Sequence, residues 1–387
     1  MKKIQRLIFL FLCCMLLSSC SGMKNIQDLT YIVTIGMDYD DETEEFTVYL
    51  QALNFANVAK QESGKPAGPI PTFVSSAKGE TLNIAISKLY KKSEPPIFFG
   101  HVKTIIFSQR LVEHKFKDVI EELGRSRTLR ETTRIVTTEE DIKKVLSIKA
   151  LFDYPAIYTV ISKKSGTETT QDEIRPTTLM NFLRDYYEPI GVAKIPTVKI
   201  DEDSWKTNEN YPILYFNGYS IFQNRAYKNV LPFDEALYVN WVSEKRVALD
   251  VKVQENDKLL AVVGLESPKM KVKYEKGAAT PKFTLEITIR SEILEKIEDI
   301  SLKQLENLIK KDISSKIEGI YKKGLENKID LFNVGEKWFK FRPKEYAKLK
   351  RSNKFYLNEE SLQDIKVQVE VINFNSYKYE REGKGDF

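Results

Sequence analysis

The sequence is poor in residues that bind soft metals or form covalent cross-links. Its three cysteines, Cys13, Cys14 and Cys20, all lie within the first 20 residues, and its two histidines are His101 and His114. Without a later cysteine, the body of the chain has no disulfide framework and no thiolate metal site. Two histidines without a neighbouring cysteine or a paired carboxylate motif also argue against a transition-metal centre. We therefore predict no metal site and no cofactor.

The motifs of common catalytic sites are absent as well. The sequence contains no HExxH, no GxxxxGK and no GxSxG; Gly218-Tyr-Ser220 begins like the last of these but continues with Ile-Phe. Scattered Asp and Glu residues leave a glycosidase-type carboxylate pair open, because a sequence does not show which carboxylates meet in space. We predict a protein without catalytic residues and keep a lipid-tethered cell-wall hydrolase as a third hypothesis.

Long hydrophobic runs are also missing. The apolar stretch Leu7 to Leu17 is about half of the roughly 20 residues that a membrane-spanning helix needs, and no later stretch approaches that length. It follows Lys2, Lys3 and Arg6 and precedes small residues, which is the layout of a secretory signal. We expect residues 1–19 to be a signal peptide that is removed.

Cys20 has the sequence context of a lipid attachment site. Leu17-Ser18-Ser19-Cys20 resembles a bacterial lipobox, in which the cysteine thiol receives diacylglycerol and becomes the new N-terminus. The alternative is an ordinary signal peptide with an incidental cysteine. Cys13 and Cys14 behave as small hydrophobes and leave with the signal. A diacylglyceryl group, with or without a third acyl chain, is sufficient for stable anchoring, so we predict a soluble body tethered to a membrane at Cys20.

The positive charge of the chain belongs partly to this signal. Removal of the three positive charges in residues 1–19 lowers the formal net charge from +5 to +2. This balance gives no argument for nucleic acid, and we predict no nucleic-acid partner. The whole chain is 42% hydrophobic, and its length is enough for two or three domains.

The first expected module, residues 20–204, alternates strand and helix signals. Two β-rich runs around the acidic turn Asp38 to Glu45 read as a hairpin. The turn has EF-hand-like carboxylates, but Thr43 stands where the calcium loop needs glycine, so we interpret it as a solvated turn. The other predicted elements are a helix with buried positions from Leu82 to Leu89, a strand at 102–107, a helix through Val112 to Leu123, and a helix that begins at Thr138 with Asp141 as its capping partner.

A middle module, residues 205–265, and a last module, residues 266–387, are expected to follow the linker at 201–210. The predicted elements are strands at 213–222 broken at Asn217-Gly218, a helix from Pro232, strands at 270–274 and 283–289, a helix at 302–329 and an alternating strand at 365–372. We predict an elongated α+β protein of two to three mixed domains, each with a β-sheet packed by helices.

A basic stretch runs from Lys337 to Lys354. It has eight basic residues against one acid, Glu345, with four aromatic residues interleaved. On a tethered protein this stretch could lie against anionic lipid headgroups. The other interpretation is a solvated face whose aromatic residues cover the core. Both stay open at this point.

Several motifs, in this order, resemble the Ger(x)C family, the lipoprotein C subunits of spore germinant receptors. They are the lipobox ending at Cys20, Ile35-Gly-Met-Asp38, Gly100-His-Val-Lys-Thr-Ile-Ile-Phe107, Arg130-Glu-Thr-Thr-Arg134, Phe216-Asn-Gly-Tyr-Ser-Ile-Phe222, Asp330-Leu-Phe-Asn-Val-Gly335, Trp338 and Val367-Gln-Val-Glu-Val-Ile372. Family members often carry tryptophan and aspartate soon after the lipid cysteine, whereas Ser21-Gly-Met-Lys-Asn25 stands here.

The resemblance implies an elongated protein of three α+β domains on the outer face of the spore's inner membrane, with no catalytic activity. It also implies two integral-membrane partners, an A-type and a permease-like B-type receptor subunit, and a role in the response to nutrients. The alternative from the residues is a solute-binding lipoprotein of a transport system, which would hold a small ligand between two lobes.

Overall fold

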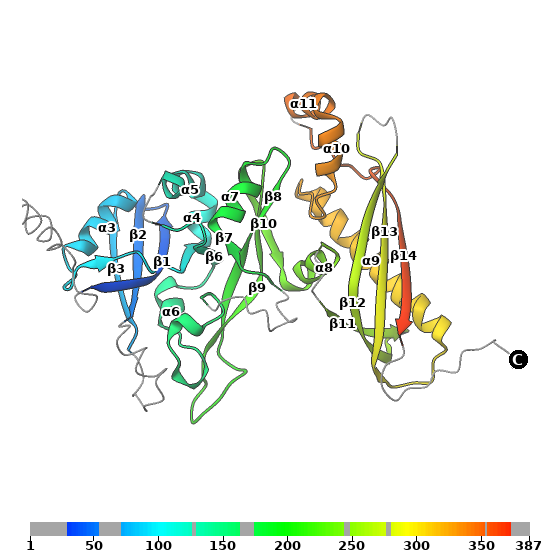
Figure 1. Ribbon diagram of the computed structural model, residues 1–387, viewed down its shortest axis with the longest axis horizontal. Coiled ribbons are helices and arrows are strands. Elements are labelled where there is room, and N and C mark those ends of the chain that lie inside the picture. Colours follow the sequence, from blue (N-terminus) through cyan, green and yellow to red (C-terminus); the bar gives the residue numbers. More distant parts are fainter. Residues whose placement is uncertain are drawn as a thin grey trace, which may run out of the picture.

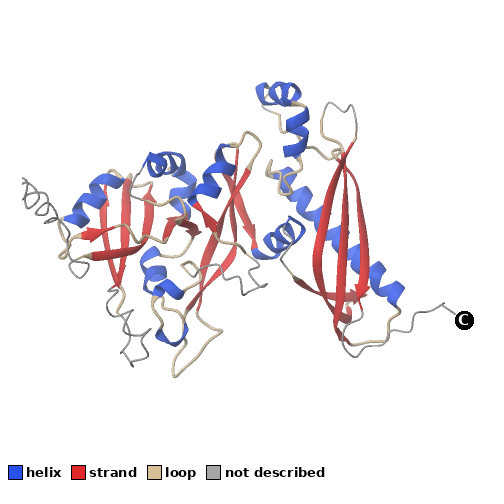
Figure 2. Cartoon of the chain, in the orientation of Figure 1, coloured by secondary structure: helices blue, strands red, loops and turns tan. Residues whose placement is uncertain are grey.

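Two β-sheets lie toward opposite ends of an elongated body in the computed structural model, each with helices packed on it (Figures 1 and 2). The structure describes residues 29–53, 71–125, 129–162, 174–243, 248–275, 280–352 and 354–372. The predicted α+β class and elongated form are confirmed. The signal peptide and Cys20 lie outside the described residues.

The N-terminal sheet has the strand order β10-β9-β8-β6-β5-β1-β2-β3, with β4 paired to β1 and β7 paired to β6. β1 is central, antiparallel to β2 and parallel to β5. The strands are β1 (Thr30–Asp40), β2 (Glu45–Leu53), β3 (Phe73–Gly79), β4 (Ile97–Phe98), β5 (Thr104–Ser108), β6 (Arg134–Thr138), β7 (Thr177–Thr178), β8 (Val192–Asp201), β9 (Ile213–Gln223) and β10 (Ala226–Pro232).

Both faces of this sheet are buried, which explains the continuous apolar run of β5. Ile105 and Phe107 belong to the core under one face, and Ile106 belongs to a separate core on the other. The helices are α3 (Leu82–Tyr90), α4 (Gln109–His114), α5 (Phe116–Arg125), α6 (Ile142–Ser147) and α7 (Leu179–Tyr187), with short 3₁₀ turns η3 (Leu151–Asp153) and η4 (Ala156–Tyr158).

Two helix predictions in this part are wrong in detail. The single helix expected through Val112 and Leu123 is two helices, because Lys115 has a non-helical backbone (φ −132°, ψ 9°) and separates α4 from α5. Thr138 does not begin a helix: it ends β6, and its hydroxyl donates to the Val198 carbonyl at 2.9 Å. The cap is Asp141 itself, whose carboxylate accepts the Lys144 N–H at 2.8 Å.

The residues around 213–222 form one strand rather than two. β9 runs unbroken from Ile213 to Gln223 and pairs with β8 on one side and β10 on the other. Where the break was expected, Asn217 is an extra residue in β9, because Gly218 pairs with Thr197 and Phe216 pairs with Val198. Gly218 has φ +134°, and a Cβ there would lie 2.1 Å from the Leu231 carbonyl oxygen, so only glycine fits.

Neither of the two expected module limits coincides with the boundary between the two sheets. The limit at 204/205 lies in the connection between β8 and β9 of one sheet, and the limit at 265/266 lies inside β12 (Lys258–Tyr274). The sheet pairing gives no support to either limit, and the domain division stays a prediction of the sequence.

The C-terminal sheet has the order β11-β12-β13-β14. Its last two strands are parallel and are connected through α9, which packs on the sheet. The elements of this part are α8 (Phe233–Ser243), β11 (Leu249–Glu255), β12, β13 (Phe283–Lys296), α9 (Leu302–Glu326), α10 (Gly335–Phe341), α11 (Pro343–Arg351) and β14 (Leu362–Ile372).

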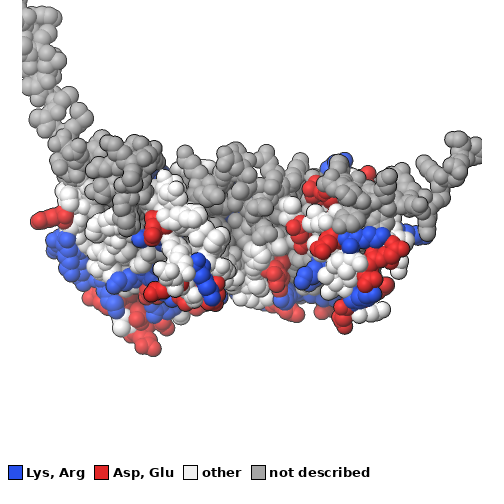
Figure 3. Space-filling view, turned by 90° about the horizontal axis from the view of Figure 1, so that it is seen from below, with Lys and Arg blue, Asp and Glu red and all other residues white. Residues whose placement is uncertain are grey.

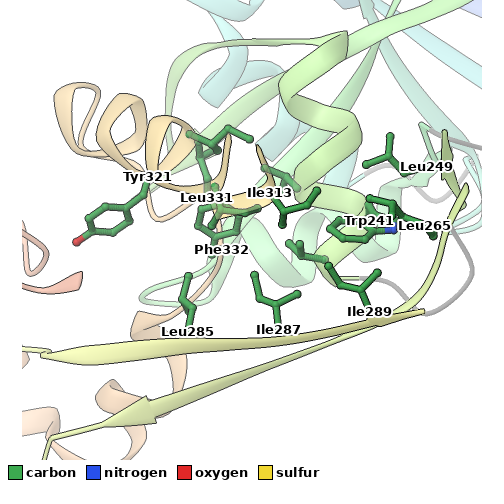
Figure 4. Close-up of a cluster of buried hydrophobic side chains, with 14 of the residues drawn as sticks. Trp241, Leu249, Leu265, Leu285, Ile287, Ile289, Ile313, Tyr321, Leu331 and Phe332 are labelled. Atoms are coloured by element: carbon green, nitrogen blue, oxygen red, sulfur yellow. Dashed lines mark hydrogen bonds between the residues drawn. The ribbon is translucent and has the colours of Figure 1, made fainter. Parts of the chain in front are cut away.

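One hydrophobic core joins α8, α9 and the C-terminal sheet (Figure 4). Trp241 of α8 is fully buried and donates its indole N–H to the Leu265 carbonyl at 3.1 Å. The alternating residues Leu285, Ile287 and Ile289 of β13 face this core. The predicted long helix and terminal strand are confirmed, whereas the sequence analysis missed β11 and the first half of β12.

Candidate functional site

A buried carboxylate, Asp330, lies in the loop between α9 and α10 with only 2% of its surface exposed. One carboxylate oxygen accepts the Val334 N–H at 2.9 Å; the other accepts the Gly335 N–H at 2.6 Å and the Tyr356 hydroxyl at 2.9 Å. The loop folds this way because the carboxylate satisfies N–H groups at the start of α10 that have no partner within the helix.

Gln223, the last residue of β9, connects this loop to the N-terminal sheet. Its side-chain oxygen accepts the Asp330 N–H at 3.0 Å, and its Nε2 donates to the Tyr356 hydroxyl oxygen at 3.1 Å. Gln223 is 1% exposed, so both bonds are shielded from water. We call Gln223, Asp330 and Tyr356 the junction. Its hydrogen bonds join β9 of the N-terminal sheet to the loop between α9 and α10 and to the segment between α11 and β14.

Aromatic residues pack around the junction. Trp338 stacks on Tyr356 with 6.2 Å between ring centroids, and Tyr346 donates its hydroxyl to the Pro189 carbonyl at 2.7 Å. A Cβ on Gly335 would lie 2.3 Å from the Tyr356 ring, so the close approach of α10 requires glycine. Two separate contacts thus connect residues 330–356 to the N-terminal part. One is Tyr346 with Pro189, which lies between α7 and β8, and the other is Gln223 with Asp330 and Tyr356.

The electrostatics of the junction are those of a buried polar network. Burial raises the pKa of the Asp330 carboxyl, and the N–H groups of Gly335 and Val334 and the Tyr356 hydroxyl oppose this shift. Burial also raises the pKa of Tyr356, and the nearby Asp330 carboxylate adds to that effect. Among the described residues no ion pair involves Asp330, so hydrogen bonds stabilise it. All three donors hydrogen-bond to one carboxylate. The arrangement connects two parts of the molecule.

The structure brings together three of the motifs singled out in the sequence. Phe216 to Phe222 forms most of β9, Asp330 to Gly335 forms the loop, and Trp338 packs on the aromatic side. The sequence analysis missed Gln223 and Tyr356. Gln223 could have been noticed in the sequence, because it is a polar residue directly after an apolar strand. No sequence pattern singles out Tyr356.

The two histidines and the acidic turn have local partners. His101 packs against the rings of Tyr31 and Phe98, with centroids 5.1 and 5.8 Å away, and His114 lies 4.0 Å from Asp41. Asp40 accepts the N–H groups of Glu42 and Thr43, so it closes the turn. Within the described ranges, no group of three or more Cys, His, Asp or Glu side chains could hold a metal ion.

The basic stretch forms α10 and α11. Trp338 and Tyr346 are 6% and 7% exposed and cover the core, as one interpretation expected, but Phe341 is 82% exposed. Phe339 is partly buried and packs against the same core. The core-covering interpretation therefore accounts for three of the four aromatic residues and not for Phe341.

An apolar cavity of about 1020 Å³ lies at the edge of the N-terminal sheet. It is lined by β1, β2, β3, the end of α3 and the segment 92–97. All of these belong to one part of the molecule, whereas the solute-binding alternative places a ligand between two lobes. No helix in the described ranges is long and apolar enough to cross a membrane.

Comparisons with known proteins point to spore germination. Residues 22–200 match the family described as "Spore germination protein N-terminal domain", and residues 217–374 match "Spore germination B3/ GerAC like, C-terminal". Spore germination protein KC of Bacillus subtilis (strain 168) is 22% identical over 94% of each chain, and spore germination protein A3 of the same strain is 24% identical over 45% of this chain and 46% of its own. The crystal structure of the GerBC protein has the same fold, with a TM-score of 0.53 and 15% identity over 91% of this chain and all of that one.

Proposed function

Because this chain belongs to the Ger(x)C family of spore germination proteins, we propose that it is a non-catalytic, lipid-anchored subunit of a nutrient germinant receptor. In this proposal Cys20 carries the lipid and becomes the N-terminus of the mature chain. The partners are the A-type and the permease-like B-type membrane subunits, and the protein sits on the outer face of the spore's inner membrane.

The observation that carries the proposal is the lipobox at Leu17 to Cys20, ahead of a body that matches germination families in both of its parts. The N-terminal family match begins at residue 22, directly after the predicted lipid site. The junction supports a coupling role, because it fixes the part nearest the tether to the C-terminal part through buried hydrogen bonds. A body of this kind can hold membrane partners in a set arrangement without performing a reaction.

Replacement of Cys20 tests the anchor. We expect Cys20→Ala to abolish incorporation of a labelled palmitate and to impair the response of spores to nutrient germinants. Cys14→Ala is the matched control: it also removes one thiol, but from the predicted signal peptide, and we expect it to leave labelling and germination unchanged. Undiminished palmitate labelling of the Cys20→Ala protein would contradict the proposal.

The solute-binding alternative predicts a different result. A ligand at about 100 times its dissociation constant adds roughly 2.7 kcal/mol to the free energy of unfolding. We expect amino acids and sugars to leave the unfolding temperature of the protein unchanged, and a clear upward shift with one of them would favour the alternative.

A further inference from the structure

The helices α10 and α11 form a compact unit at the edge of the C-terminal part (Figure 1). Its inner side is fixed, because Trp338 and Tyr346 are buried and Tyr346 donates a hydrogen bond to Pro189. These contacts hold in place the backbone that carries the exposed side chains of the unit. A partner that binds the exposed side chains of this unit would therefore bind a part of the molecule that is packed against the core.

The exposed side chains of this unit and of the residues that follow it are mostly basic. Lys340 pairs with Glu336 at 2.5 Å, and Arg342 lies 3.6 Å from Glu345. These two carboxylates leave most of the cations uncompensated: within the described residues, five exposed cations of this unit make no ion pair. They are Lys344, Lys348, Lys350, Arg351 and Lys354.

On the face of the molecule seen in Figure 3, charges of both signs lie side by side, with Lys and Arg beside Asp and Glu at both ends of that face. Neighbouring opposite charges produce little net field, whereas a group of like charges produces a local potential that attracts an anionic partner.

Phe341, the last residue of α10, is the exposed aromatic residue of this unit. It is 82% exposed, and Pro343, two residues later, is exposed as well. An aromatic ring beside several lysines and arginines is the combination by which proteins bind the interface of an anionic bilayer: the cations contact the headgroups, and the ring enters the apolar boundary.

We propose that Phe341 and the five cations form a second membrane contact, which binds the anionic lipid headgroups of the membrane that holds Cys20. This inference rests on the proposed tether. Residues 20–28 span at most about 30 Å when extended, so the tether keeps the body close to the lipid surface. At that effective concentration a contact that is weak alone is occupied for much of the time. The ring favours a bilayer over an acidic protein as the partner.

The absence of cysteine after residue 20 allows a direct test. Phe341→Cys in the full, lipidated chain provides a single site for an environment-sensitive dye, since the thiol of Cys20 carries the lipid. The protein is reconstituted into vesicles of phosphatidylcholine alone or with about 30% phosphatidylglycerol. We expect a blue shift and about threefold weaker iodide quenching in the anionic vesicles, with both effects lost at high salt.

Phe152→Cys is the matched control. Phe152 is 85% exposed and lies in η3 of the N-terminal part, so the same dye there should respond equally to both vesicle types. Equal quenching of the dye at position 341 in the two vesicle types would overturn the proposal. Protection that appears only when the other receptor subunits are added would overturn it as well, in favour of a protein partner.

Charge reversal tests the role of the cations. Each Lys or Arg near an anionic surface is worth about fivefold in binding, which corresponds to about 1 kcal/mol, so Lys348→Glu with Arg351→Glu should weaken the contact at least about 30-fold. Both residues are exposed, so the unfolding midpoint should not change. Unchanged protection of the dye in this variant would also count against the proposal. A chain without lipid at Cys20 gives a different result. Its free Cys20 thiol reacts with the dye, and the protein does not float with either vesicle type.

Discussion

The two parts of the molecule hold an aspartate in opposite ways. In the N-terminal sheet, Asp38 near the end of β1 pairs with Arg110 at 2.5 Å, and their side chains are 12% and 55% exposed. In the C-terminal part, Asp330 has no cation among the described residues and accepts three hydrogen bonds away from water. Water can replace much of the first interaction but cannot reach the second. The comparison indicates that the junction, unlike the Asp38 ion pair, is stabilised by interactions that water does not reach. It adds to the hydrophobic core that Tyr219, Ile221 and Leu231 of the N-terminal sheet share with the C-terminal part.

Removal of the Asp330 carboxylate should have the largest effect. Asp330→Ala leaves the N–H groups of Val334 and Gly335 and the Tyr356 hydroxyl without their acceptor, and each buried donor without a partner costs about 1–3 kcal/mol. We expect the free energy of unfolding to fall by about 3 kcal/mol or more in guanidinium titrations. Asp299→Ala removes a fully exposed carboxylate and should leave the midpoint unchanged. Equal midpoints for the two variants would show that the junction carries no special stability.

Crowding at the junction should have a smaller effect. Gly335→Ala places a Cβ 2.3 Å from the Tyr356 ring, and overpacking of this kind costs about 1–3 kcal/mol. Gly319→Ala is the matched control: it lies in α9 with no atom within 4 Å of the new Cβ, and its better helix propensity should stabilise the protein by up to about 1 kcal/mol. We expect the free energy of unfolding to fall with Gly335→Ala and to rise with Gly319→Ala. An equal loss of stability in both variants would refute the packing argument.

Loss of the Asp38 ion pair should have the smallest effect. Arg110→Ala is expected to lower the free energy of unfolding by about 0.5–1 kcal/mol, because the guanidinium is more than half exposed. The loss should shrink when the same titration is done in 1 M salt, which screens exposed charges. A loss as large as that of Asp330→Ala, or one that salt does not reduce, would remove the distinction between the two aspartates.

The sequence predicted those elements whose apolar spacing is regular over several residues. The hairpin of β1 and β2, the helix α3, the long helix α9 and the terminal strand β14 are present where they were expected. The break at Lys115 was not predictable, since neither glycine nor proline marks it, and the packing of Phe116 with Phe182 and Phe222 sets the new direction of α5. Tertiary contacts there override a continuous helical pattern.

The junction was predictable only in pieces. The motif Phe216 to Phe222 and the segment Asp330 to Gly335 were both singled out, but they lie more than 100 residues apart in the sequence. Nothing in their composition shows that Gln223 bridges them to Tyr356, because a long-range hydrogen bond leaves no periodic pattern in the chain. The acidic turn, in contrast, was interpreted correctly from its residues alone, since its contacts are local.

The central position of β1 has a mechanical consequence. β1 begins at Thr30, directly after the segment that leads from Cys20, and it is hydrogen-bonded to β2 on one side and β5 on the other. A pull on the chain ahead of Leu29 therefore acts along a strand held from both sides, so that two ladders of hydrogen bonds must shear together. A strand at the edge of the sheet could be peeled away one bond at a time. Force that enters the protein through its N-terminal segment is thus transmitted to the whole sheet.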